Sequence, residues 1–306
     1  MTVRRLPRAA PGRRDRASVA TVKLLVTGAG GQLGRELVLY AEAQGSDVVG
    51  ADRSRLDVTD ADAVADVVSS LRPDAVVNCA AWTAVDACES DPDRAYRDNG
   101  TAVVQLAAAC DDIGAHLVQV STEYVFDGTS SRPYRETDTA DPLSVYGASK
   151  RAGEHAALAL GDGSTIVRTS WVCGEHGNNM VRTVLGLVDR GVPMRFVDDQ
   201  HGCPTFTADL APVLHRVAVE RTGGVIHTTN TGARSWYQFV REIVAADGGD
   251  PDTISPISTA ELDPPRPAQR PANGVLDGAR MRELGWPPLR DVPDALADLV
   301  PRLRRR

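Results

Sequence analysis

A tyrosine and a lysine that stand four residues apart could together deliver a proton. Tyr146 and Lys150 lie in the run YGASK, and Lys150 is one of only two lysines in this arginine-rich chain. Positions i and i+4 share one face of a helix, so the phenol and the ammonium can converge. A nearby cation lowers the pKa of a phenol, and a slim ammonium can reach between a tyrosine and ribose hydroxyls where a planar guanidinium does not fit. We therefore predict that Tyr146 is a general acid whose pKa Lys150 lowers.

A hydroxyl at the end of a buried strand extends this candidate site. The run HLVQVST at 116–122 is mostly apolar and ends in Ser121 and Thr122. In a doubly wound sheet, ligands bind at the carboxyl ends of the strands. We therefore expect Thr122 to face the same cleft as Tyr146.

A glycine-rich turn near the start of the chain predicts a dinucleotide site. The apolar run VKLLVTG continues into AGGQLG, which spaces Gly28, Gly31 and Gly34 three residues apart. Glycines here let the chain turn tightly and let backbone N–H groups approach a pyrophosphate at the positive end of a helix. The usual spacing would place the third glycine at position 33, where this chain has Leu33.

The residues after the second predicted strand would select the cofactor. Asp52 could accept hydrogen bonds from a ribose 2′-hydroxyl, which favours NADH. Arg53 and Arg55 could instead pair with a 2′-phosphate, which favours NADPH. We expect both cofactors to be used, with a preference for NADPH. Asp57 and Val58 are expected on the adenine side of the pocket.

Alternating strands and helices would position all these residues. Helical patterns separate five strand-like runs at 22–28, 47–52, 75–80, 116–122 and 164–172, and these helices are expected at 34–45, 60–73, 91–113 and 145–160. Strands that are continuous Val, Leu and Ile runs are typical of a sheet buried on both faces, and successive βαβ units give a parallel sheet. The predicted fold class is α/β: a doubly wound, Rossmann-like parallel sheet with a smaller C-terminal α/β domain for the substrate.

These strand and helix patterns divide the chain into three parts. We expect residues 1–21 to be a disordered extension, residues 22–172 to bind the dinucleotide, and residues 173–306 mainly to bind the substrate, with segments near 200–230 returning to the first domain. The later elements are less regular, with helices expected at 178–190, 207–220 and 235–247 and strands at 194–198 and 225–229. The proline-rich stretch 250–275 is predicted to be an extended loop.

Composition excludes several classes of function. The formal net charge is −7 although residues 1–22 hold six arginines against one aspartate, so the body of the chain is acidic and nucleic acid is not an expected partner. No apolar run is long enough for a membrane helix. The five cysteines are scattered without a C-x-x-C pair, and the six histidines lack metal-ligand spacing. We expect a cytoplasmic protein without a metal site.

Together the glycine turn, the strand-end hydroxyl and Tyr-x-x-x-Lys resemble the extended short-chain dehydrogenase/reductase superfamily. The chain is more specifically similar to the dTDP-4-dehydrorhamnose reductase family. The motifs that carry this resemblance occur in the family's order between 22 and about 280: GAGGQLGREL, NCAAWTAVDACE, STEYVFDG, YGASKRAGE, RTSWVCG, GNNMVRT, DQHGCPT and RPANGVLD.

The resemblance implies a reaction and a set of site residues. It implies that Tyr146 gives a proton to a C4 ketone, that Lys150 holds the nicotinamide ribose, and that Thr122 bonds the reacting oxygen. Tyr124 and Trp171 would contact the nucleotide-sugar, a dTDP-4-keto-6-deoxy sugar. The residues implied to line the cofactor site are Gly28, Gly31, Gln32, Leu33, Ala80, Ala81 and Thr83. The implied product is dTDP-L-rhamnose, formed from dTDP-4-dehydro-β-L-rhamnose as the last step of its biosynthesis.

Departures from the family pattern keep alternatives open. Glu123 and Cys173 stand where the family more often has Asp and Tyr or a small residue, which permits a 4-ketoreductase of a related antibiotic sugar, such as dTDP-dihydrostreptose synthase. A non-catalytic NADP-binding regulatory subunit would be free to lose Tyr146 or Lys150. Some family members are dimers that bind Mg²⁺, but Ala208 replaces one acidic position beside Glu36, so Mg²⁺ is not expected. The protein is expected to be a monomer or a homodimer.

Overall fold

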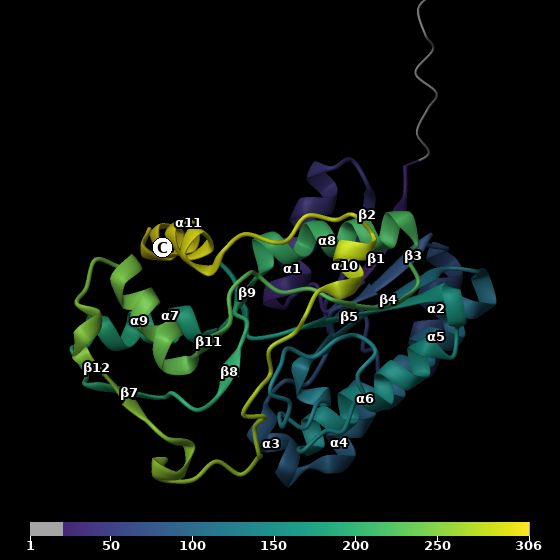
Figure 1. Cartoon of the computed structure of the whole chain (residues 1–306). Helices are drawn as coiled ribbons and strands as arrows, with labels where there is room; N and C mark the ends of the chain where they lie inside the picture. Colours follow the sequence, from purple (N-terminus) through teal and green to yellow (C-terminus); the bar gives the residue numbers. More distant parts are fainter. Residues whose placement is uncertain (1–20, 306) are drawn as a thin grey trace, which may run out of the picture.

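A six-stranded parallel sheet forms the centre of the larger part of the molecule. The computed structural model describes residues 21–305, so the prediction for residues 1–21 falls almost wholly outside the described part (Figure 1). The strand order is β10-β5-β4-β3-β1-β2. The strands are β1 (Lys23–Thr27), β2 (Asp47–Ala51), β3 (Ala75–Asn78), β4 (His116–Thr122), β5 (Ser164–Thr169) and β10 (Gly224–His227). Every neighbouring pair in this sheet is parallel, which confirms the predicted fold class.

Helices cover both faces of this sheet. On one face lie α1 (Gln32–Ala43) and α8 (Thr207–Glu220), and on the other lie α2 (Ala61–Leu71), α5 (Ala102–Ile113) and α6 (Val145–Leu158). Alternate strand residues enter opposite cores: Leu24 and Val26 pack with α1 and α8, whereas Leu25 packs with α2 and α5. The continuous apolar runs in the sequence follow from this burial on both sides.

The helix predicted over 91–113 is broken into shorter pieces. Two short helices, α3 (Val85–Ser90) and α4 (Pro92–Tyr96), precede a π-helical turn at Arg97–Thr101, and α5 follows directly. The wide turn directs the buried Asn99 toward two neighbours: its amide oxygen accepts from the Trp82 N–H at 2.8 Å and its amide nitrogen donates to the Ser149 hydroxyl at 3.0 Å. This turn ties the loop after β3 to α6. Hydrophobic periodicity carries no signal for it.

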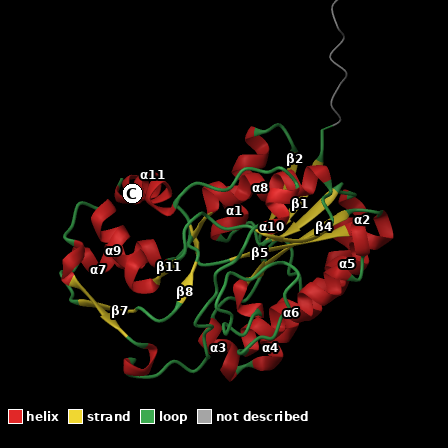
Figure 2. Cartoon of the chain, in the orientation of Figure 1, coloured by secondary structure: helices red, strands yellow, loops and turns green. Residues whose placement is uncertain are grey.

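A second, smaller part of helices and short strands lies beside the large sheet (Figure 2) and has its own hydrophobic core. Its helices are α7 (Met180–Asp189), α9 (Trp236–Ala246) and α11 (Val292–Arg304), and its strand pairs are β6 (Val172–Cys173) with β9 (Thr205–Phe206), β7 (Met194–Val197) with β12 (Ile254–Ile257), and β8 (His201–Gly202) with β11 (Arg234–Ser235). A short helix, α10 (Ala279–Glu283), returns to the core of the large sheet, where Met281 packs.

Two predicted boundaries are wrong. The strand expected over 164–172 ends at Thr169, because Trp171 has a φ of 46° and turns the chain out of the sheet. The loop expected over 250–275 contains β12, which pairs in parallel with β7 and buries Ile254 and Ile257. Two isoleucines three residues apart are too few to outweigh the surrounding prolines in a sequence pattern. In the described part of the chain, no helix is long and apolar enough to cross a bilayer.

Candidate active site

Two adjoining cavities follow the carboxyl ends of the sheet strands. One, of about 420 Å³, lies over β3, β4 and β5, and the other, of about 520 Å³, lies beyond the glycine turn along β2. Gly31, Cys79, Ala80 and Ala81 line both, so the two spaces are continuous along the turn. Apart from Arg55, every residue predicted from the sequence to bind cofactor or substrate, or to act in catalysis, lines one cavity or both. Residues more than 140 positions apart in the chain thus meet in one cleft.

The glycine turn allows close backbone approach at two points. Gly28 has a φ of +67°, and a Cβ there would lie 2.6 Å from the Ala80 nitrogen. A Cβ on Gly34 would collide with the Gly28 carbonyl oxygen, so the third glycine of the motif is needed at position 34, while Leu33 packs in the core. No side chain caps the start of α1, where Gly31 is the N-cap. The free N–H groups of that first turn are suited to a phosphate.

The residues after β2 surround the outer end of the 520 Å³ cavity. Asp52 accepts from the Ser54 hydroxyl at 2.6 Å and from the Ser54 and Arg55 N–H groups, which hold the pKa of Asp52 below its usual value. Arg53 pairs with Asp57 at 3.2 Å, whereas Arg55 donates to the Gly50 carbonyl. Of the two arginines, only Arg53 lines the cavity.

Helix α6 presents both predicted catalytic side chains to the 420 Å³ cavity. The Ser144 hydroxyl caps its first turn by accepting from the Gly147 N–H, and Tyr146 and Lys150 follow on one face. Both side chains are buried, and the Lys150 ammonium donates to the Val120 carbonyl at 2.8 Å. The Thr122 hydroxyl lies within hydrogen-bonding reach of the Tyr146 phenol. The three groups therefore line a single cavity.

The structure does not show the predicted lowering of the Tyr146 pKa by Lys150. Burial is the largest influence on the phenol and raises the pKa of Tyr146, Glu123 adds to the rise, and the hydrogen bond with Thr122 opposes it. Burial also lowers the pKa of Lys150 to about 8. The ammonium is directed at a strand carbonyl, and Lys150 is not among the largest influences on the pKa of the phenol. Tyr146 is held as a neutral phenol, which is the form that can donate a proton.

Glu123 is a site residue whose role sequence reasoning missed. Its side chain is 2% exposed, yet it lines the cavity and accepts from the Thr122 hydroxyl at 2.8 Å. Burial raises the pKa of Glu123 to about 7. The hydroxyls of Ser121 and Thr169 line the same cavity and have no hydrogen-bond partner within residues 21–305. A carboxylate directly after an apolar strand, next to Thr122, was the available signal.

Aromatic side chains in two pairs form part of the cavity wall, here called the aromatic wall. Trp171 stacks on Trp236 with ring centroids 3.6 Å apart, and the Tyr124 ring meets Tyr146 edge-on at 5.4 Å. All four line the cavity. Nothing near Trp236 in the sequence signals a role, because its partner lies 65 residues away and is brought there by the second part of the fold.

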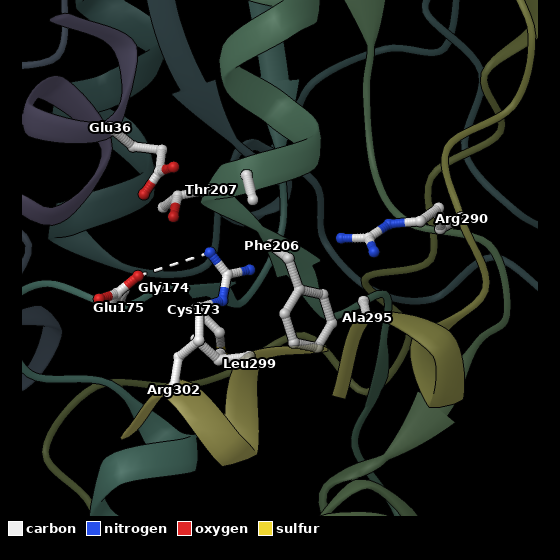
Figure 3. Close-up of a pocket in the computed structure, with 11 residues that line it drawn as sticks. Glu36, Cys173, Gly174, Glu175, Phe206, Thr207, Arg290, Ala295, Leu299 and Arg302 are labelled. Atoms are coloured by element: carbon white, nitrogen blue, oxygen red, sulfur yellow. Dashed lines mark hydrogen bonds and ion pairs between the residues drawn. The ribbon is translucent and has the colours of Figure 1, made fainter. Parts of the chain in front are cut away.

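The surroundings of Glu36 do not fit a magnesium ion. Glu36, Glu175 and Arg302 point toward the same small space, of about 10 Å³, and the Arg302 guanidinium pairs with Glu175 at 3.5 Å (Figure 3). Mg²⁺ needs near-octahedral oxygen ligands. Here a fixed cation already neutralises one carboxylate, Ala208 offers no ligand, and residues 21–305 contain no cluster of three acidic, His or Cys side chains that could hold a metal.

Comparisons with known proteins agree with this geometry. Residues 22–305 match the family model described as RmlD substrate binding domain. A dTDP-4-dehydrorhamnose reductase of Streptomyces griseus is 45% identical, and the match spans 91% of this chain and 93% of that protein. A dTDP-4-keto-6-deoxy-D-glucose reductase of Streptomyces niveus is 40% identical, covering 92% and 98%. The structure of a dTDP-4-dehydrorhamnose reductase of Bacillus anthracis in complex with NADP superposes with a TM-score of 0.88 at 33% identity, covering 92% of this chain and 99% of that one. The chain belongs to the dTDP-4-dehydrorhamnose reductase family of extended short-chain dehydrogenases/reductases.

Proposed function

We propose that this protein reduces the C4 ketone of dTDP-4-dehydro-β-L-rhamnose to give dTDP-L-rhamnose, the last step of dTDP-rhamnose biosynthesis. The observation that carries the proposal is the single cleft in which Tyr146, Lys150 and Thr122 meet the glycine turn. The family of the chain and the names of its relatives support the same reaction.

Three side chains would handle the proton and the oxygen of the ketone. When bound, a reduced nicotinamide supplies the hydride that the ketone carbon receives. Tyr146, neutral because it is buried, donates its proton to the developing alkoxide. Thr122 holds that oxygen in place, and Lys150 binds the nicotinamide ribose while placing a positive charge near the reacting groups. Positioning and acid catalysis account for the reaction without a metal.

The cofactor would lie along both cavities. Its pyrophosphate would contact the N–H groups of the glycine turn, whose tight packing needs glycine because a Cβ at Gly28 or Gly34 would meet neighbouring backbone. Gln32, Leu33, Gly34, Ala80, Ala81 and Thr83 would line the nicotinamide half, and Asp52, Arg53, Asp57 and Val58 the adenosine half. Because Arg53 lines the cavity with an exposed guanidinium, and Asp52 is engaged by Ser54, we favour NADPH over NADH.

The sugar nucleotide would enter from the aromatic wall. Tyr124 and Trp171 are the proposed contacts, with Trp236 fixing the plane of Trp171. We propose that residues 22–172, together with α8 and β10, form the cofactor-binding part and that most of residues 173–306 form the substrate-binding part. Because the cleft is built from one chain, a monomer or a homodimer can hold a complete site.

A related 4-ketoreductase activity is the second candidate. The Streptomyces niveus relative is named for a different 4-keto sugar. Glu123, which lines the 420 Å³ cavity, also departs from the residue that is usual in the family. A non-catalytic subunit is disfavoured, because it has no need for a buried tyrosine and lysine in the cavity. The five cysteines all lack disulfide partners, which supports a reducing, cytoplasmic location.

A substrate panel tests the proposal. Purified protein is mixed with NADPH and enzymatically prepared dTDP-4-keto sugars, and the loss of absorbance at 340 nm is followed with identification of the product by mass spectrometry. We expect the rhamnose precursor to give the highest kcat/KM. Absence of any NADPH oxidation with the whole panel at micromolar protein would refute the reductase assignment.

A further inference from the structure

We propose that Glu123 resupplies the proton of Tyr146 through the hydroxyl of Thr122. This inference rests on the proposed reduction, in which each turnover takes one proton from Tyr146. The reaction must draw that proton from water in the end, so the buried phenol needs a route by which it is reprotonated.

Three side chains form a connected row from the phenol to the carboxyl. The Thr122 hydroxyl lies within hydrogen-bonding reach of Tyr146 and donates to the Glu123 carboxylate at 2.8 Å. Ser170 also hydrogen-bonds Glu123. A hydroxyl donates and accepts at once, so Thr122 can take a proton from one neighbour while giving its own to the other. Glu123 is the only carboxyl among the described residues that line the 420 Å³ cavity.

The surroundings of Glu123 keep it able to hold a proton at neutral pH. No arginine or lysine forms an ion pair with it within residues 21–305, and the backbone at Gly274 covers its side chain so closely that a Cβ there would lie 2.9 Å from it. The groups that face it are Tyr124 beside it, Tyr146 with Lys150 from α6, Ser170 after β5, and Cys203 from the second part. Arg270, whose charge acts on the neighbouring Tyr124, is engaged bidentately by Asp86. Burial, with no cation paired to the carboxyl in the described part of the chain, raises the pKa of Glu123 to about 7.

The proton balance of the proposed step is simple. After the phenol has given its proton to the ketone oxygen, the Tyr146 phenolate takes the proton of the Thr122 hydroxyl. Thr122 takes the proton of the Glu123 carboxylic acid at the same time. The step ends with a neutral Tyr146, a neutral Thr122 and a Glu123 carboxylate, which takes a proton from water in the cavity. Glu123 acts on the reaction only through Thr122, so it positions and supplies a proton without touching the substrate.

Rapid mixing of Glu123→Gln with NADPH and dTDP-4-keto-rhamnose separates this role from a structural one. The amide keeps the size and the acceptor for Thr122 but has no proton to give. The first turnover uses the proton already on Tyr146, so its rate should stay within about threefold of wild type, whereas later turnovers should slow by about 10²-fold. The trace should therefore show a burst of one NADPH per active site. Glu123→Asp should restore multiple turnovers, and Glu36→Gln, a carboxyl outside the cavity, should match wild type.

The pH profile gives a second readout. Because Glu123 must be protonated to resupply Tyr146, wild-type kcat should fall as pH rises above about 7, and this limb should be missing in Glu123→Gln. If the first turnover of Glu123→Gln is slowed as much as its steady-state turnover, Glu123 only supports the structure of the site. Steady-state turnover of Glu123→Gln equal to that of wild type would overturn the relay outright. If wild-type protein itself gives no first turnover, the proposed reduction is wrong and the relay falls with it.

Discussion

Lys150 is buried at a place where we expect only a narrow cation to fit. Its ammonium is enclosed by the cavity wall and makes one hydrogen bond, to Val120. Lys150→Arg keeps the charge, but a broad planar fork does not fit the space of a slim ammonium. We expect kcat to fall by about 10²-fold or more.

A matched control for this substitution exists in the same chain. Lys23→Arg changes the other lysine, which is partly exposed at the start of β1 and pairs with Asp47 at 3.9 Å. This variant should keep wild-type kcat and NADPH affinity. Near wild-type turnover of Lys150→Arg, measured at saturating NADPH, would show that the size of the cation is unimportant.

Glu123 also makes a prediction about stability. Its pKa rises from 4.5 in the unfolded chain to about 7 in the folded protein, so the folded state binds the proton more tightly. Stability from this group is complete below about pH 4.5 and is lost as pH rises through about 7. The free energy of unfolding of Glu123→Gln relative to wild type should therefore increase by about 2–3 kcal/mol between pH 4.5 and 8. Urea unfolding at several pH values measures it, and a pH-independent difference would contradict the burial argument.

At the residue scale, the sequence predicted the positions of those side chains that are fixed by a local motif. Gly28, Tyr146 and Lys150 owe their places to motifs within one turn or helix, so their spacing was informative. The environments of Glu123 and Trp236 depend on contacts with distant segments, such as Gly274 and Trp171. The same reason explains why the predicted lowering of the tyrosine pKa failed: burial, which spacing does not reveal, outweighs the nearby cation.

At the element scale, the contact between α1 and the glycine turn sets the shape of the cofactor site. A Cβ on Gly34 would meet the Gly28 carbonyl and lie 2.9 Å from the Ala29 Cα, so α1 would have to move away from the turn. We expect Gly34→Ala to weaken NADPH binding by about tenfold or more and to cost about 1–3 kcal/mol of stability.

Gly186→Ala is the matched control for that helix. It also lies within a helix, α7, but its Cβ would meet only the end of Arg190 at 3.6 Å, so it should bind NADPH normally and be no less stable. Fluorescence titration of NADPH and thermal melting of both variants measure these effects. Equal NADPH affinity in Gly34→Ala would mean that the turn does not position the cofactor.

Element prediction succeeded where apolar patterns were long. The parallel strands β1 to β5 and helices α1, α2 and α6 lie close to their expected positions, because each buries a continuous run or a full helical face. The strand β12 could not be predicted, because it depends on pairing with β7, which is distant in the sequence. The π-helical turn at Arg97–Thr101 could not be predicted either, because it depends on the hydrogen bonds of Asn99 to distant residues.

At the scale of the whole molecule, the cleft depends on how the second part returns to the sheet. Arg270 donates to both oxygens of Asp86, which joins the segment after β12 to α3 beside Tyr124. The chain also crosses back through α8 and β10 to complete the large sheet. Such crossings bring Trp171 and Trp236 into the cavity that Tyr146 lines, and contacts between distant segments leave no local pattern from which Trp236 could have been predicted.

Transfer of deuterium from NADPH to the sugar tests the central claim most directly. NADPH labelled with deuterium at both positions of the nicotinamide C4 is incubated with dTDP-4-keto-rhamnose and protein, and the product is examined by NMR and mass spectrometry. A ketone held in this cleft, with Tyr146 at its oxygen, should yield a product with one deuterium at sugar carbon 4, and Tyr146→Phe should form it about 10²-fold more slowly while still binding NADPH. A product without deuterium at that carbon, or one formed equally fast without the phenol, would contradict the account.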